Sequence, residues 1–274
     1  MSVASIDAGG GNLSVGDVLS RAWRVLTGDI LFFLAVPFII QVVIYVGAFG
    51  GALVLAVAGV ATNLGWLVGV GIFLAVVLAL SFQMIGQGVL LLGAFQRLRG
   101  QPLRIGEALR RVLARFFPLV GLTILWSLAL VFTLLACSLI LSALAAATGG
   151  VMLLLMPAFF VPSTILLVMW AVVVPACIVE GLGPIASMSR SAGLSKGCRW
   201  KIFGIMALLA LLLVVGFIVQ LIVTPVSQVL ATIVGTIWFV GWTAYWNCAI
   251  IMTYHDLRVA KEGIDTEQIA SIFD

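Results

Sequence analysis

One acid and three bases stand close together in the sequence: Glu180, Arg190, Lys196 and Arg199. Guanidinium and ammonium groups donate charge-assisted hydrogen bonds to carboxylates and to phosphates, so two interpretations are open. In the first, Glu180 pairs with one of the bases and holds the connecting segment in place. In the second, the bases form a pocket for a lipid phosphate. We favour the first interpretation, and the second remains a hypothesis for a headgroup site.

A second basic cluster, Arg97–Arg115, holds six of the fourteen Lys and Arg residues. Read as a helix from Arg104, it places charged side chains on one face and apolar side chains on another. The charged face consists of Arg104, Glu107, Arg111 and Arg115, and the apolar face of Ile105, Ala108, Leu109, Val112 and Phe116. This pattern is typical of a helix that lies in a membrane surface. We expect the arginines to contact anionic lipid headgroups, namely Arg104, Arg110, Arg111 and Arg115.

Residues suited to catalysis or metal binding are scarce. The chain has a single histidine, His255, with Asp256 beside it, and it contains no Walker-type phosphate loop. Its four cysteines form no CxxC pair. We therefore predict no catalytic residues, no metal and no cofactor. An enzyme would require the fold to bring His255, Asp256 and Glu180 around one cavity.

The elements that must position these residues are membrane-spanning helices. The chain is 64% hydrophobic and 9% charged, and its mean hydropathy is +1.30, which excludes an ordinary soluble domain. Three stretches, 30–96, 116–179 and 202–255, contain no Asp, Glu, Lys or Arg. Because a bilayer span takes about 20 helical residues, each stretch holds two spans and a turn.

The expected fold class is an all-α integral membrane protein with six transmembrane helices. They form three parallel hairpins, each preceded by a cytoplasmic-side amphipathic helix. The expected spans are approximately 30–50, 67–95, 117–146, 152–179, 202–223 and 229–254. Residues 1–13 form a disordered arm, 14–255 the membrane domain and 256–274 a cytoplasmic tail.

The distribution of basic residues predicts the orientation. Every Lys and Arg lies in the N-terminal segment, the two long connectors or the tail, whereas the turns inside the hairpins are uncharged. By the positive-inside rule the charged side is cytoplasmic, and both termini lie there. The net charge of +4 then reflects topology and contact with anionic lipids, so we expect no nucleic-acid partner.

An internal repeat relates the surface helices. Val15–Ala22 superposes on Ile105–Val112 after a shift of 90 residues, and in both copies an acid and an arginine stand four residues apart. This is the spacing of a helical ion pair. A third copy around Arg190 matches more loosely, because Ala186 stands where the acid would be.

Uncharged polar and aromatic residues within the spans suggest further roles. Gln83 and Gln87 share one face of the second span, where they either hydrogen-bond to other helices, which we favour, or line a substrate path. Trp238, Trp242 and Trp246 recur every four residues, and we favour packing against helices or lipid over ligand stacking.

The third connector and the end of the last span are similar to a known family. Pro175 and Glu180 precede the pairs Arg190-Ser191 and Lys196-Gly197, followed by Trp200, with Tyr254, Asp256, Leu257 and Arg258 after the last span. With these motifs the chain resembles the membrane-domain family named after glycerophosphoryl diester phosphodiesterases. The resemblance implies a six-span bacterial inner-membrane protein. It does not imply phosphodiesterase activity, because a separate soluble domain catalyses that reaction in the fused members.

The sequence thus favours a non-catalytic membrane protein that binds or organises lipids or partner membrane proteins through basic cytoplasmic-face helices. Two features motivate this interpretation: the Arg-rich surface helix, and the absence of charge from the span interiors. The alternative is a transporter or channel for a small or lipidic substrate. The prolines of the fourth span and the pair Gln83 and Gln87 motivate that alternative.

Overall fold

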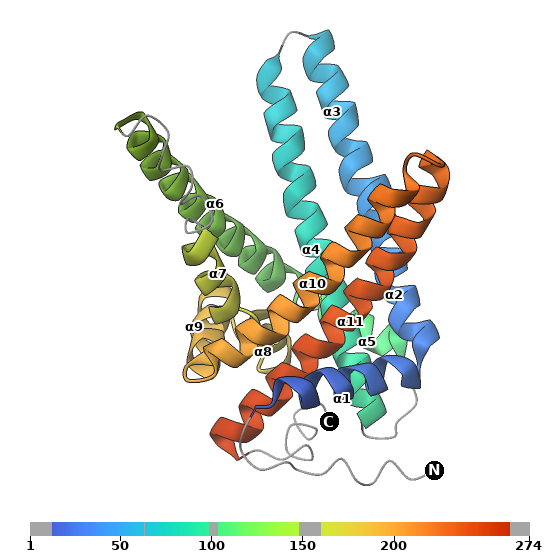
Figure 1. The fold of residues 1–274 in the computed structure, drawn as a ribbon, viewed down its shortest axis with the longest axis vertical. Coiled ribbons are helices and arrows are strands. Elements are labelled where there is room, and N and C mark those ends of the chain that lie inside the picture. Colours follow the sequence, from blue (N-terminus) through green and yellow to red (C-terminus); the bar gives the residue numbers. More distant parts are fainter. Residues whose placement is uncertain (1–12, 63, 99–103, 148–159, 264–274) are drawn as a thin grey trace.

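The computed structural model describes residues 13–62, 64–98, 104–147 and 160–263. Within these ranges the chain is helical and contains no strand. The predicted arm apart from residue 13, the start of the predicted fourth span and the last part of the tail lie outside the described residues. The elements, shown in Figure 1, are α1 (Val15–Gly28), α2 (Ile30–Val43), the π-helical η1 (Ile44–Phe49), α3 (Gly50–Ala61), α4 (Gly65–Leu98), α5 (Ile105–Leu113), α6 (Phe116–Ala147), α7 (Phe160–Met169), α8 (Val173–Val179), α9 (Pro184–Ser195), α10 (Arg199–Val223) and α11 (Gln228–Glu262).

Six helical segments of the described chain are long and apolar enough to cross a membrane, which is the architecture of a multi-pass membrane protein. They are Ile30–Ala61, Gly65–Gln96, Phe116–Leu144, Phe160–Val179, Arg199–Val223 and Gln228–Glu262. The all-helical class and the six span-length helices are therefore confirmed.

Two of these segments are longer than the sequence suggested. The first continues past residue 50 to Ala61, because Pro37 lies inside α2 without ending it and η1 carries the helix on into α3. The last continues past residue 254 and ends only at Gly263, whose φ of 62° is the left-handed conformation that commonly terminates helices. Residues 256–262, expected in the tail, are thus part of α11.

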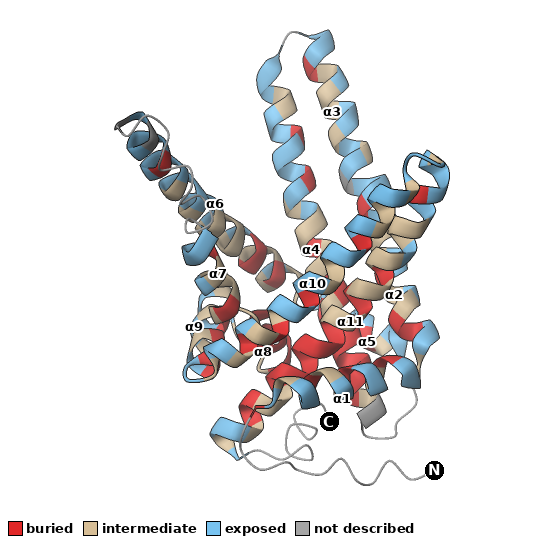
Figure 2. Ribbon diagram, in the orientation of Figure 1, coloured by how far each residue is buried: buried red, intermediate tan, exposed pale blue. Residues whose placement is uncertain are grey.

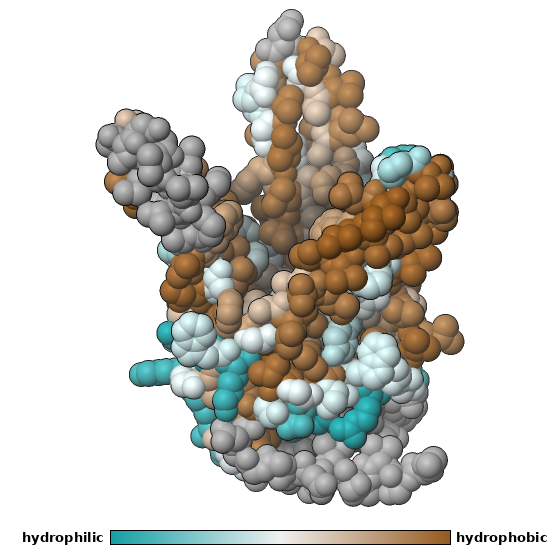
Figure 3. Space-filling view, in the orientation of Figure 1, coloured by the Kyte–Doolittle hydropathy of each residue, from teal (hydrophilic) through white to brown (hydrophobic). Residues whose placement is uncertain are grey.

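The helices gather at one end of the molecule and spread at the other. In Figure 1, α3 runs alongside α4 and α10 alongside α11, while the far end of α6 lies well apart from the α3–α4 pair. Figure 2 shows that the buried residues concentrate where α1, α8 and the lower parts of α4 and α11 meet. Figure 3 shows apolar side chains over the spreading arms and polar ones near the gathered end. We call this gathered end the charged end.

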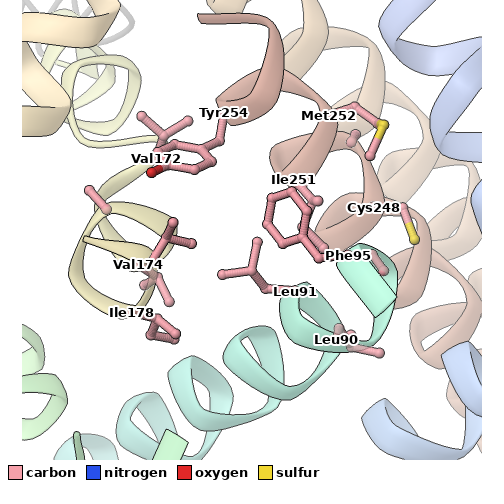
Figure 4. Packing of buried hydrophobic residues seen from close by; sticks show 14 of the residues in the cluster. Leu90, Leu91, Phe95, Val172, Val174, Ile178, Cys248, Ile251, Met252 and Tyr254 are labelled. Atoms are coloured by element: carbon pink, nitrogen blue, oxygen red, sulfur yellow. The ribbon is translucent and has the colours of Figure 1, made fainter. Parts of the chain in front are cut away.

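The core at the charged end joins helices that are distant in the sequence. Leu91 of α4, Val174 of α8, and Ile251 and Tyr254 of α11 belong to one cluster of buried residues, which Figure 4 shows in close view. A β-carbon on Gly88 of α4 would lie 2.4 Å from a methyl group of Ile178 in α8. The glycine therefore leaves the space between α4 and α8 that the Ile178 side chain occupies.

The tryptophans of α11 pack against α10. The indole N–H of Trp238 donates to the Leu212 carbonyl at 3.2 Å, and that of Trp242 to the Leu209 carbonyl at 2.7 Å. Gly216 of α10 makes room for Trp238, because a β-carbon there would lie 2.0 Å from an indole carbon. These two tryptophans therefore serve helix packing, in agreement with the interpretation that we favoured.

Gly216→Ala should separate α10 from α11, because the added methyl group and the Trp238 indole would occupy the same space. Overpacking of this kind costs about 1–3 kcal/mol, so the unfolding temperature of the purified protein should fall. Gly241→Ala is the matched control, since a β-carbon there meets no atom within 4 Å. Equal unfolding temperatures for the two variants would contradict the tight fit.

Candidate functional site at the charged end

A network of acids and bases links α8, α9 and α11. Glu180 follows α8 directly, and one of its carboxylate oxygens accepts a hydrogen bond from Nε of Arg190 at 2.7 Å. Its other oxygen accepts from the Tyr254 hydroxyl at 3.0 Å. Arg190 also pairs with Glu262, which accepts a second bond from Nε of Arg258 at 3.0 Å. The three helices therefore share one polar junction beside the core.

The charges of this junction balance. Glu180 and Glu262 oppose Arg190 and Arg258, and burial of each side chain is tolerated because its partners are close. Burial alone would lower the pKa of Arg190, but its hydrogen bonds to the two carboxylates outweigh that effect and raise it. The side chain of Arg258 is only 6% exposed, and its Nη1 has no hydrogen-bond partner among the described residues.

The structure separates the four residues proposed from the sequence. Glu180 and Arg190 pair with each other, as the simpler interpretation proposed. Lys196 and Arg199 are exposed and form no ion pair with Glu180. The sequence did not single out Tyr254 as a donor to Glu180, or Glu262 as a partner of Arg190.

The Arg-rich segment forms α5, which packs against α4 through its buried residues Ala108 and Val112. Glu107 accepts a hydrogen bond from Arg111 at 2.8 Å and lies 3.8 Å from Arg104. Arg104, Arg110 and Arg111 are exposed. On the same short helix Ile105 and Leu109 are also exposed, by 51% and 41%.

Arg115 has a different setting from the other arginines of its segment. It lies in the turn between α5 and α6, is half-buried, and donates from Nη1 to the carbonyl of Gly181 at 2.8 Å. The contact lies beside an open groove of about 390 Å³ between the ends of α4, α5 and α8. Its lining consists of Leu92, Arg111, Ala114, Arg115, Ile178, Val179, Glu180 and Gly181. We call this space the Arg115 groove.

The Arg115 groove joins the two basic clusters of the sequence analysis in a way that spacing alone does not show. Arg111 and Arg115 come from one connector and Glu180 from the next. The sequence indicated only part of this site. The Gly-rich run after Glu180 predicts a turn, but nothing in it predicts that the Arg115 side chain packs against that turn.

The glutamines of α4 alternate with residues of the core, such as Ile85 and Val89. Gln83 and Gln87 are half-buried, and neither hydrogen-bonds to a described residue, so the interhelical bonds that we favoured for them are not present. In α11, the buried hydroxyl of Thr243 also has no partner among the described residues.

His255 belongs to a separate contact from the Glu180 junction. Its Nδ1 lies 3.3 Å from a carboxylate oxygen of Asp256, and Asp256 pairs with Arg21 of α1. The Tyr245 hydroxyl adds a second tie between α11 and α1 by donating to the Leu19 carbonyl at 3.1 Å. Within the described part of the chain, no three His, Cys, Asp or Glu residues are placed to hold a metal ion. The absence of catalysis stays a prediction.

Comparison with known proteins does not extend this description: no family model, no curated protein and no solved structure matches the chain. The resemblance noted from the sequence therefore stays a prediction. The geometry shows a basic, partly apolar surface at the ends of span-length helices.

Arg190→Gln should loosen the junction of α8, α9 and α11, because Glu180 and Glu262 would both lose a cationic partner. Loss of charge-assisted hydrogen bonds at a half-buried site costs about 1–3 kcal/mol, which a thermal unfolding curve of the purified protein would detect. Arg199→Gln removes the same charge from an exposed position and should unfold close to wild type. Equal decreases in the unfolding temperature of both variants would show that net charge, and not the junction, determines the stability.

Proposed function

We propose that this protein is a non-catalytic membrane protein that binds or organises lipids, or partner membrane proteins, through basic helices on its cytoplasmic face. In this proposal the six spans form three parallel hairpins in a bacterial inner membrane, with both termini in the cytoplasm. Each hairpin follows an amphipathic surface helix. The resemblance to the phosphodiesterase membrane-domain family is part of the proposal.

The exposed surface of α5 carries the proposal. Arg104 and Arg110 are exposed beside the exposed apolar side chains Ile105 and Leu109, while Ala108 and Val112 hold the helix on α4. A helix with exposed bases and exposed apolar residues is stable at the boundary of a bilayer, where both kinds of side chain find partners. Its place in the chain between two span-length helices, α4 and α6, supports such a position.

Contacts of the other surface segments support a repeated design. Arg21 in α1 pairs with Asp256 near the end of α11, and Arg190 in α9 pairs with Glu180 at the end of α8. In both cases a base of a surface helix binds an acid near the end of a span. At the matching place in α4 stands the uncharged Gln96, whose side chain accepts the backbone N–H of Arg104 at 3.0 Å. Arg110 of α5, which is exposed and forms no ion pair with a described residue, is thus left more available to lipid.

Replacing Arg104 and Arg110 together by Gln should reduce the enrichment of phosphatidylglycerol over phosphatidylcholine around the protein. Each base near an anionic surface contributes about 1 kcal/mol, and the effect should weaken as salt is added. The measurement is the lipid composition retained by protein extracted from mixed bilayers in small polymer-bounded discs.

Arg104→Lys with Arg110→Lys is the matched control, because it keeps both charges on the same helix. This control should retain wild-type lipid enrichment. An unchanged enrichment in the Gln variant, at low and at high salt, would refute a role of α5 in binding anionic lipid.

A specific observation favours transport as a second candidate function. Gln83 and Gln87 lie at membrane depth without hydrogen-bond partners among the described residues, and the buried Thr243 hydroxyl is in the same condition. Polar groups left without partners in hydrocarbon are costly, and a substrate path would use them. The transported species would then be a small or lipidic molecule.

Transport predicts that liposomes containing the protein show a flux that Gln83→Leu or Gln87→Leu abolishes. Gln41→Leu is the matched control, because Gln41 is a half-buried glutamine in the first span-length segment, Ile30–Ala61. A flux insensitive to both α4 variants, or no flux over a broad panel of small and lipidic solutes, would count against transport.

A further inference from the structure

We propose that the Arg115 groove binds the phosphate of one lipid headgroup, as a single saturable site distinct from the general attraction of α5 for anionic lipid. The group bound in the groove would be a phosphate ester, held by Arg115 and Arg111. This inference rests on the proposed lipid-binding function and goes beyond it by naming one site, its residues and its ligand class.

Arg115 is a cation in need of a counter-ion. It is half-buried and forms no ion pair with any residue that the structure describes. A charge removed from water without a partner costs free energy, which a bound anion would recover. The neighbouring acid Glu180 does not supply that partner: its carboxylate bonds to Arg190 and Tyr254, and no ion pair joins it to Arg115.

Gly181 holds the guanidinium of Arg115 in place. Its φ of 66° suits glycine, and a β-carbon there would lie 2.5 Å from Nη2 of Arg115. The guanidinium therefore lies directly against the backbone while Nη1 donates to the Gly181 carbonyl. A guanidinium has five N–H donors, so most of them remain for an anion.

The groove also offers an apolar wall at the depth of the headgroups. Leu92, Ile178 and Val179 line it. Three span-length helices end or begin there, at Gln96, Phe116 and Val179, which places the groove at the membrane boundary. The side chain of Phe117 beside it is 83% exposed, as expected where a protein surface meets lipid.

The Glu180 carboxylate and the apolar wall together favour a lipid phosphodiester over free phosphate as the ligand. The Glu180 carboxylate lines the groove and would repel the second negative charge of inorganic phosphate or of a phosphate monoester, whereas a phosphodiester carries a single charge. The apolar wall would contact the glycerol and upper acyl carbons, which a soluble phosphate lacks.

The test is a titration of the purified full chain in uncharged detergent with phosphatidylglycerol, in which native mass spectrometry counts the bound lipids. We expect one lipid per chain to bind more tightly than the rest. Arg115→Gln should weaken that binding at least about tenfold, and Arg24→Gln, which removes the same charge from an exposed position of α1 outside the groove, should change it by less than about twofold.

Arg111→Gln is the second variant, because Arg111 is exposed and its loss should leave the fold intact even if Arg115→Gln unfolds. It should weaken the single site by at least about threefold. Equal effects of Arg24→Gln and Arg111→Gln, or the absence of a tighter first lipid, would overturn the site. Displacement of the lipid by equal concentrations of glycerol phosphate or inorganic phosphate would overturn the lipid assignment and show a site for soluble phosphate.

The variants separate this inference from the function on which it rests. Replacing Arg104 and Arg110 tests the general enrichment of anionic lipid without touching the groove lining. If enrichment depends on those two arginines and the single site is absent, the groove proposal fails alone. If the single site is present and enrichment is insensitive to them, the general proposal fails alone.

Discussion

Charged side chains cannot be left unpaired in hydrocarbon, and this constraint confines them to one end of the molecule. There, acids and bases of different helices pair with one another: Arg190 binds Glu180 and Glu262, and Arg21 binds Asp256. The main core lies at the same end, as Figure 2 shows. Ionic contacts and apolar packing therefore hold the same helices together at the same level.

The opposite ends of the helices depend on different forces. Away from the core the spans have apolar side chains on their outer surfaces, and apolar contact with lipid is as favourable there as contact with another helix. Close approach then depends on shape. Gly216 makes room for Trp238, and Gly235 makes room for Gln220, so α10 and α11 each supply a notch for the other. Helices without such notches, such as the far part of α6, spread apart in Figure 1.

The sequence was sufficient for the properties that depend on local composition. Six span-length helices follow from three charge-free stretches, because the cost of charge in a bilayer acts on each residue separately. The end of α11 could not be predicted in this way: residues 256–262 look like a polar tail, yet Asp256 and Glu262 both gain partners from distant helices. The contact of Arg115 with Gly181 likewise joins residues 66 positions apart, which no periodicity reveals.

The arginines of one short segment therefore have different physical settings. Arg104 and Arg110 are exposed, where salt screens their charge and many lipids can share it. Arg115 is half-buried against Gly181, where its orientation is restricted and screening is weaker. Exposed charge attracts anionic lipid without discrimination, whereas an oriented guanidinium beside an apolar wall can distinguish one headgroup from another. Selectivity among anionic lipids, if this surface has it, must then arise at Arg115 and not along the exposed face of α5.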